Sequence, residues 1–192
     1  IGSNGQSKAF HWSPYAPMNA LPTAAGRESA ANAINDNGEI VGKVGGYAAL
    51  WSGGGFPLMI ANSQSEALDI NVHGQIVGWI EPAPGDRHAF LYLRPPGAIV
   101  LLTSILPAGS NWILQSANGI NDKGQIVGLG IYNGVAHAYR LRPAIRDLSA
   151  TIVAQVVSIV FGIRDDSGGL QIGPLGPMPI PPWNPMRVNA PL

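Results

Sequence analysis

Short apolar segments alternate with turns rich in glycine and asparagine along most of the chain, and one such pattern occurs three times. The copies read ANAINDNGEIVG at residues 31–42, ALDINVHGQIVG at residues 67–78 and ANGINDKGQIVG at residues 117–128. Seven of the twelve positions are identical in all three copies, and an eighth is always Glu or Gln. This agreement indicates internal duplication, so the chain is built from repeats.

Each copy predicts a β-hairpin. In each copy an Asn is followed three residues later by a Gly. The Asn side chain can form a hydrogen bond with the nearby backbone, and the Gly readily takes a positive φ, so the two together favour a tight turn. The Ile-Val pair after the turn places apolar side chains on both faces of the second strand, so we expect a neighbouring sheet on each face. The small residues at the two ends of each copy are expected to let backbones approach closely where repeats converge.

A second, shorter signature marks the outer part of each repeat. It reads AFHW at residues 9–12, AALW at 48–51, AFLY at 89–92 and AYRL at 138–141. Together with later apolar segments, it gives each unit four short strands. The hairpin motif recurs after 36 and then 50 residues, which brackets the roughly 40–50 residues of a four-stranded propeller blade. We therefore predict an all-β fold, a small β-propeller over residues 1–173.

These motifs resemble a bacterial family known as probable extracellular HAF repeats. The His-Ala-Phe string of that family stands at residues 88–90 and, as His-Ala-Tyr, at residues 137–139, beside the I-N-x-x-G-[EQ]-I-V-G element. The first copy departs from the pattern with Tyr47-Ala48-Ala49. The resemblance covers about residues 8–142. It implies a secreted or periplasmic repeat protein and brings no catalytic residues with it.

The ends of the repeat region predict how a ring would close. Residues 8–21 form a half unit without inner strands, and residues 156–163 and 170–172 flank a turn at 165–169. A hairpin there would pair with the half unit, giving four blades with the N- and C-terminal strands in one blade. A helix across 148–161 is the alternative. In a further alternative, the ring is incomplete and a second copy finishes it as an oligomer.

Residues 174–192 are rich in proline, which disfavours both a helix and a central strand. An extended strap is the expected conformation. It either packs against the repeat domain through Trp183 and Met186 or serves as a docking segment for a partner.

Composition narrows the class of partner. Eleven basic residues balance eleven acidic ones, so the chain has no basic field for nucleic acid or anionic lipid. There is no cysteine, which rules out disulfides and thiolate chemistry. The longest apolar stretch, residues 150–163, is too short and too interrupted to span a bilayer.

Repeated polar residues are the first candidate binding set. They are Asn35, Asn71 and Asn121, with Asp36, Asp122 and Asp69 beside them. Equivalent residues of symmetric units lie in a ring, and amide and carboxylate oxygens are ligands that calcium prefers. The three asparagines are therefore the candidate calcium ligands. The structural alternative is that Asn and Asp serve only the turn conformation.

Histidine is the second candidate set. His88 and His137 occupy the same repeat position, and His11 and His73 complete the four in the chain. They either pack within the sheets or converge to bind a ligand or metal. No two lie at the spacing of helical metal sites.

Catalytic motifs are missing from the sequence: no G-x-S-x-G elbow and no phosphate-binding loop is present. Two functions follow. The first is a binding module for a small molecule, glycan or protein, which uses the ring face where loops such as 81–87 and 108–112 gather. The second is a calcium-assisted hydrolase of the lactonase or esterase type with its site at the axis. The tryptophans and Tyr92 serve either as packing anchors or as sugar platforms.

Overall fold

The computed structural model describes residues 5–24, 26–95 and 97–142 of the chain. The predictions for residues 148–172 and for the strap at 174–192 lie outside these residues. Within them the protein is all-β, with four antiparallel sheets and one short 3₁₀ helix. The all-β part of the predicted fold is therefore confirmed.

Two sheets belong to the N-terminal half. The leading hairpin consists of β1 (Phe10–Ser13) and β2 (Ala16–Ala20), and it is the predicted half unit. Unit 1 is a four-stranded meander of β3 (Ser29–Ile34), β4 (Ile40–Val44), β5 (Tyr47–Trp51) and β6 (Leu58–Met59).

Two further sheets follow. Unit 2 repeats the four-stranded meander with β7 (Gln64–Ile70), β8 (Ile76–Glu81), β9 (His88–Leu93) and β10 (Ala98–Leu101). After the helix η1 (Leu102–Ile105), unit 3 has three strands among the described residues: β11 (Trp112–Ile120), β12 (Ile126–Tyr132) and β13 (Val135–Leu141).

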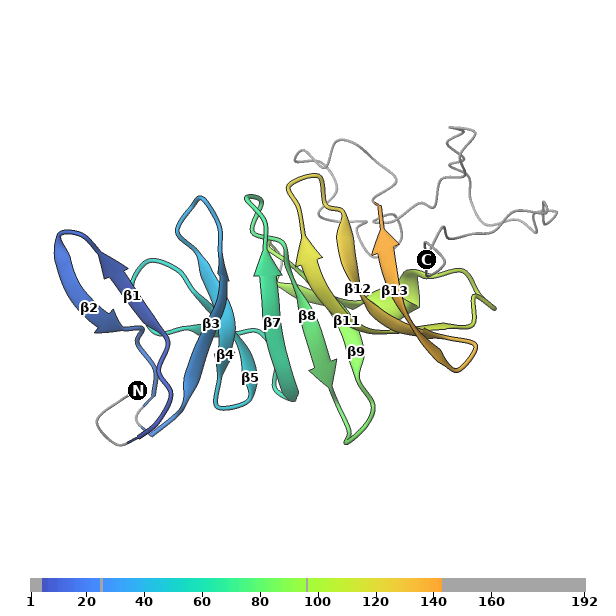
Figure 1. The fold of residues 1–192 in the computed structure, drawn as a ribbon, viewed down its shortest axis with the longest axis horizontal. Helices are drawn as coiled ribbons and strands as arrows, with labels where there is room; N and C mark the ends of the chain where they lie inside the picture. Colours follow the sequence, from blue (N-terminus) through green and yellow to red (C-terminus); the bar gives the residue numbers. More distant parts are fainter. Residues whose placement is uncertain (1–4, 25, 96, 143–192) are drawn as a thin grey trace.

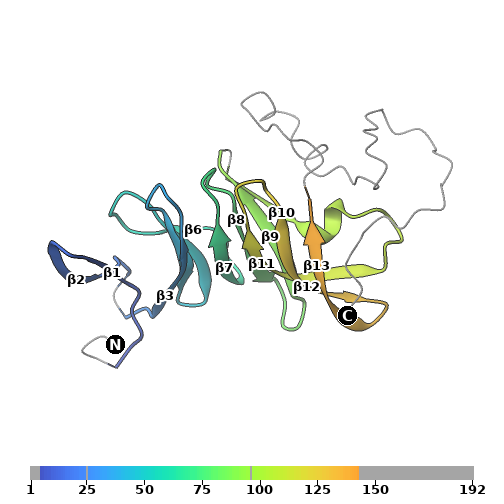
Figure 2. The same cartoon turned by 45° about the horizontal axis from the view of Figure 1, so that its top comes forward.

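The sheets form a row (Figure 1), in which units 1, 2 and 3 pack face to face on one another in that order. Unit 1 meets unit 2 mainly through β4 and β5 against β7, and unit 2 meets unit 3 through β8 and β9 against β11. Figure 2 shows the leading hairpin at one end of this row and unit 3 at the other. Each unit therefore touches its neighbours in sequence, as expected of stacked repeats.

The row has two long edges. The turns between β3 and β4, between β7 and β8 and between β11 and β12 lie along one of them, at the top of Figure 1. This is the Asn-turn edge, because each turn begins with the motif asparagine. The opposite ends of the same strands carry the connections 45–46, 82–87, 107–111 and 133–134. We call this side the loop edge.

Apolar side chains fill the interfaces between units. Unit 2 shows the arrangement best, since Ile76 and Val77 are consecutive, both are completely buried, and they belong to different clusters. Ile76 packs in the cluster shared with unit 1, and Val77 packs in the cluster shared with unit 3. Burying one such side chain contributes about 1.5–3 kcal/mol, so unit 2 depends on both of its neighbours.

The final glycine of the motif serves a contact within its own hairpin. An added Cβ at Gly42, Gly78 or Gly128 would lie 2.0 Å from the carbonyl oxygen of residue 30, 66 or 116 in the paired strand. A register shift lies beside each of these pairs, which identifies a β-bulge. The close approach at these glycines therefore lies between the paired strands of one hairpin.

The close contact of the motif glycine predicts that an added methyl group at this position destabilises the protein. Gly78→Ala places a side chain inside the contact distance of the Glu66 carbonyl, so we expect the free energy of unfolding to fall by about 3 kcal/mol. Gly55→Ala is the matched control, since nothing lies within 4 Å of its added Cβ, and it should change stability by less than about 0.5 kcal/mol. Urea unfolding followed by tryptophan fluorescence measures both. Equal losses would refute the proposed role of the bulge.

Candidate functional site

The motif asparagines hold the three Asn turns by the same set of hydrogen bonds. Asn35 Oδ1 accepts the backbone N–H groups of Asn37 at 3.1 Å and Glu39 at 3.0 Å. Asn71 does the same for residues 73 and 75, both at 3.1 Å. Asn121 does so for residues 123 and 125, both at 3.0 Å. The turn glycine has a positive φ in every copy, so the predicted turn chemistry is confirmed.

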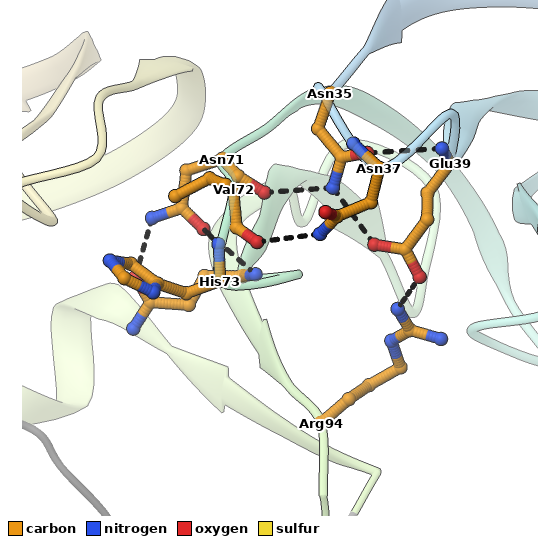
Figure 3. Close-up of polar contacts among 8 residues, drawn as sticks. Asn35, Asn37, Glu39, Asn71, Val72, His73 and Arg94 are labelled. Carbon is orange, nitrogen blue, oxygen red and sulfur yellow. Dashed lines mark hydrogen bonds and ion pairs between the residues drawn. The ribbon is translucent and has the colours of Figure 1, made fainter.

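The same side chains also join neighbouring units. Asn35 Nδ2 donates to the backbone carbonyl of Asn71 at 3.0 Å (Figure 3), and Asn71 Nδ2 donates to the carbonyl of Asn121 at 3.1 Å. Asn37 adds a parallel bond to the Val72 carbonyl at 2.9 Å. We call the three motif residues Asn35, Asn71 and Asn121 the asparagine ladder. The ladder sets the distance between successive hairpins at this edge.

These bonds use the atoms that a cation would need. Each ladder Oδ1 already accepts two N–H donors, and each Nδ2 is itself a donor. A calcium ion requires free oxygen lone pairs that point to one centre, and the ladder does not offer them. Across residues 5–24, 26–95 and 97–142, no group of three or more His, Asp or Glu side chains could hold a metal.

Two of the three aspartates singled out in the sequence accept hydrogen bonds from a neighbouring unit. Asp122 Oδ1 accepts the Val72 N–H at 3.0 Å. Asp69 accepts the Ile120 N–H at 2.7 Å and so joins unit 2 to unit 3. Asp36 lies exposed in its turn. Two of the three aspartates therefore reinforce the contact between units.

The histidines have separate surroundings. His88 Nε2 lies 2.8 Å from Asp86 in the preceding loop. His137 packs edge-on against Trp112 and Tyr132, with ring centroids 6.0 and 6.2 Å away. His73 Nε2 lies 3.2 Å from the Asp122 carbonyl at the Asn-turn edge, and His11 lies exposed in β1. Each of the first three thus has a local partner.

A partly buried ion pair links the first Asn turn to unit 2. Glu39 contacts Arg94 and also accepts a hydrogen bond from Asn35 Nδ2 at 2.8 Å (Figure 3). Burial on its own raises the pKa of Glu39, but the hydrogen bonds from Asn35 and Arg94 and the charge of Arg94 outweigh it and leave the pKa below its usual value of 4.5. The carboxylate form is therefore the one that the fold stabilises.

The loop edge of unit 2 gathers charged and aromatic groups. The Arg87 guanidinium lies over the Trp79 ring, 3.7 Å from its centroid. Glu81 accepts the Gly85 N–H at 2.7 Å and thereby shapes the loop. Arg87 Nε and His88 Nδ1 are buried and have no hydrogen-bond partner within the described part of the chain. Buried polar atoms without a partner are energetically costly.

The loop edge of unit 3 carries an aromatic cluster. Trp112 and Tyr132 stack with centroids 5.0 Å apart. Asn111 donates to Asn133 at 3.0 Å across the adjoining loops, and both residues take a positive φ. Positive φ is uncommon outside glycine and is tolerated best by Asn and Asp. Tyr132 remains partly exposed, whereas Trp112 is buried.

The other rings serve mostly as anchors. Trp51 is buried and donates from Nε1 to the Pro22 carbonyl at 2.9 Å, and Tyr92 is buried between units 1 and 2. Trp12 is exposed on β1. The packing interpretation thus holds for Trp51, Tyr92 and Trp112.

Sequence reasoning missed several contacts between repeats. Asn32 Nδ2 donates to the Ala67 carbonyl at 2.8 Å, and Lys43 pairs with Glu66 at 3.3 Å. The hydroxyls of Ser29 and Ser65 accept the backbone N–H groups of residues 9 and 48 at 3.0 and 2.9 Å. The serine contacts could have been found from the sequence. Each serine stands two residues before the first alanine of the hairpin motif, and the residue that donates to it is the first residue of an A-x-x-W signature.

A scan against protein-family models, a search of curated proteins and a search of solved structures found no match to this chain. The part of the chain that the structure describes has no helix with the length and apolar character needed to cross a bilayer. The candidate site therefore has to be judged on its own geometry.

Removing a side-chain donor of the asparagine ladder should lower the stability of the protein. Asn71→Asp keeps the oxygen that accepts the turn N–H groups but loses the donor to Asn121 and places a charge on a residue that is 3% exposed. We expect a loss of about 2–3 kcal/mol in the free energy of unfolding. Asn19→Asp, at an exposed position in β2, is the matched control and should be nearly neutral. A similar stability for the two variants would exclude the ladder as a stabilising contact.

The lowered pKa of Glu39 predicts a pH dependence. Because the folded pKa lies below the unfolded one, this residue stabilises the protein above the unfolded value, and the contribution is lost as the pH falls through the folded value. Glu39→Gln, the residue present at both equivalent positions, should reduce the fall in stability between neutral pH and about pH 3. Denaturant midpoints of both proteins across that range measure it. An unchanged pH profile would contradict the assignment.

Proposed function

We propose that this chain is a small β-propeller that acts as a non-catalytic interaction module, and that its loop edge contacts a protein partner. The stacking of four-stranded units with both faces covered supports the propeller. In the proposed ring, the leading hairpin and a hairpin at residues 156–172 share one blade, so that four blades close.

The make-up of the loop edge supports a protein partner. Arg87, Trp79 and Tyr132 are of the residue types that dominate the energetics of protein interfaces. They lie on connections of unequal length or beside them, with exposed residues at 82–86 and 133–136. Scaffolds of regular strands commonly bind through such connections.

A glycan is less well supported. Sugar recognition by rings needs open aromatic faces, but Arg87 covers Trp79, and Trp112 is buried beneath its neighbours. The calcium-assisted hydrolase has no observation in its favour, since the ladder oxygens that would serve as ligands hold the Asn turns. The interaction module is therefore the function that we retain.

The proposed location is extracellular or periplasmic. It rests on the resemblance of the repeat motif and of His88-Ala89-Phe90 to the HAF repeats. The lack of cysteine neither supports nor opposes it.

Partner capture with matched variants tests the function. The wild-type chain, Arg87→Ala with Tyr132→Ala, and the control Asp36→Ala would be immobilised in equal folded amounts and exposed to extract from the source organism. We expect a protein that binds the wild type and Asp36→Ala and that loses at least tenfold in affinity, about 1.4 kcal/mol, for the double variant. Asp36 is exposed at the opposite edge.

A protein that binds all three chains equally would contradict the loop edge as the binding surface. Equal binding of a glycan array by wild type and Asp36→Ala, with loss for the double variant, would replace the protein partner with a carbohydrate.

A further inference from the structure

The outer face of unit 3 is a largely apolar sheet face that the described residues leave uncovered. Its side chains come from β11, β12 and β13 and point away from unit 2. The apolar set consists of Ile113, Val127, Leu129, Ile131, Ala136 and Ala138, and Arg140, the cross-strand partner of Val127, lies on the same face. We call it the unit 3 outer face.

Repeat equivalence shows that the same face is buried in the other units. Val41, Val77 and Val127 occupy the same motif position, yet Val41 and Val77 are 0% exposed and Val127 is 48% exposed. The hairpin of the next unit covers each of the first two, as shown by the shared clusters. The exposure of Val127 therefore marks the place of a next unit.

The asparagine ladder stops at the same place. The Nδ2 atoms of Asn35 and Asn71 each make two hydrogen bonds, one within the turn and one to the carbonyl of the next turn. Asn121 Nδ2 makes the bond within the turn, to Gln125 at 2.8 Å, and no bond to a next unit among the described residues. A backbone carbonyl of a fourth turn would complete the pattern.

We propose that the hairpin at residues 156–172 of this chain docks on the unit 3 outer face. The proposal rests on the repeat structure and not on a partner at the loop edge or on closure of the ring.

Spacing along the chain selects this segment. β7 begins 13 residues after the end of β5 (51 to 64), and β11 begins 19 residues after the end of β9 (93 to 112). Val156 stands 15 residues after Leu141, the end of β13, between these two values. The spacing therefore predicts that the first strand of a next unit begins at the start of the apolar run 156–163.

The segment also has the chemistry of an inner hairpin. Ile163 and Leu170 flank the polar, glycine-containing turn Arg164-Asp165-Asp166-Ser167-Gly168-Gly169, which is one residue longer than the turn 121–125 between Ile120 and Ile126. Arg164 stands at the position of the turn asparagine. This change leaves the ladder intact, because the acceptor of each bond between units is a backbone carbonyl and every residue has one.

A cysteine pair tests the docking in the whole chain. The protein has no cysteine, so Val127→Cys with Ile163→Cys allows one intramolecular disulfide. Their equivalents Val77 and Ile120 lie in one buried cluster. We expect a cross-linked monomer after mild oxidation, seen by non-reducing electrophoresis and by the loss of two thiols in a labelling assay. Val135→Cys with Ile163→Cys is the control, since Val135 is exposed at the loop edge of the same sheet, and it should not cross-link.

Two results would overturn the proposal. A disulfide-linked dimer whose yield falls when the protein is diluted before oxidation would mean that a second copy covers the face. A thiol at position 127 that stays free and is labelled rapidly in a folded chain would mean that nothing covers it.

A second pair of variants tests the docking if the double-cysteine chains do not fold. In the whole chain, Val127→Asp should lower the melting temperature by several degrees more than Val135→Asp, because only the first buries a charge under the docked hairpin. Equal melting temperatures would overturn the proposal. Neither experiment uses a partner at the loop edge, so failure of the proposed function leaves both readouts unchanged.

Discussion

The structure depends on one constraint, that a single β-sheet with two apolar faces cannot be stable in water by itself. In β8 the consecutive residues Ile76 and Val77 point to opposite sides and are both fully buried. A sheet of this kind needs a neighbour on each side. The row of stacked units and the uncovered face at its end both follow from this need.

The motif asparagine couples local structure to stacking. One side chain holds its own turn through Oδ1 and reaches the next turn through Nδ2. A hairpin in the wrong register would break both sets of bonds, so the residue specifies the turn and the spacing together. This double role explains a repeated Asn without a bound ion, and it leaves the loop edge as the surface free to vary.

The local structure could be predicted from sequence, but most contacts between repeats could not. Periodicity and turn chemistry predicted the hairpins, because Gly38, Gly74 and Gly124 adopt the positive φ that the motif implies. The bulge beside Gly78 was missed, since an extra residue in one strand leaves no mark in the apolar pattern.

The ion pair of Glu39 with Arg94 was missed for a different reason. It joins residues 55 positions apart in different units, and no repeat rule relates them. The loop-edge cluster was anticipated only as a region of varied loops, because the stacking of Arg87 on Trp79 depends on the path of one connection.

Native-state hydrogen exchange measures the coupling between sheets most directly. The account predicts that amides of β7, β8 and β9 exchange only through an opening shared with β11 and β12, and that Leu114→Ala, a buried change in β11, lowers protection in both units by the same free energy. Loss of protection confined to unit 3, with unit 2 unchanged, would contradict the claim that each sheet is stable only between its neighbours.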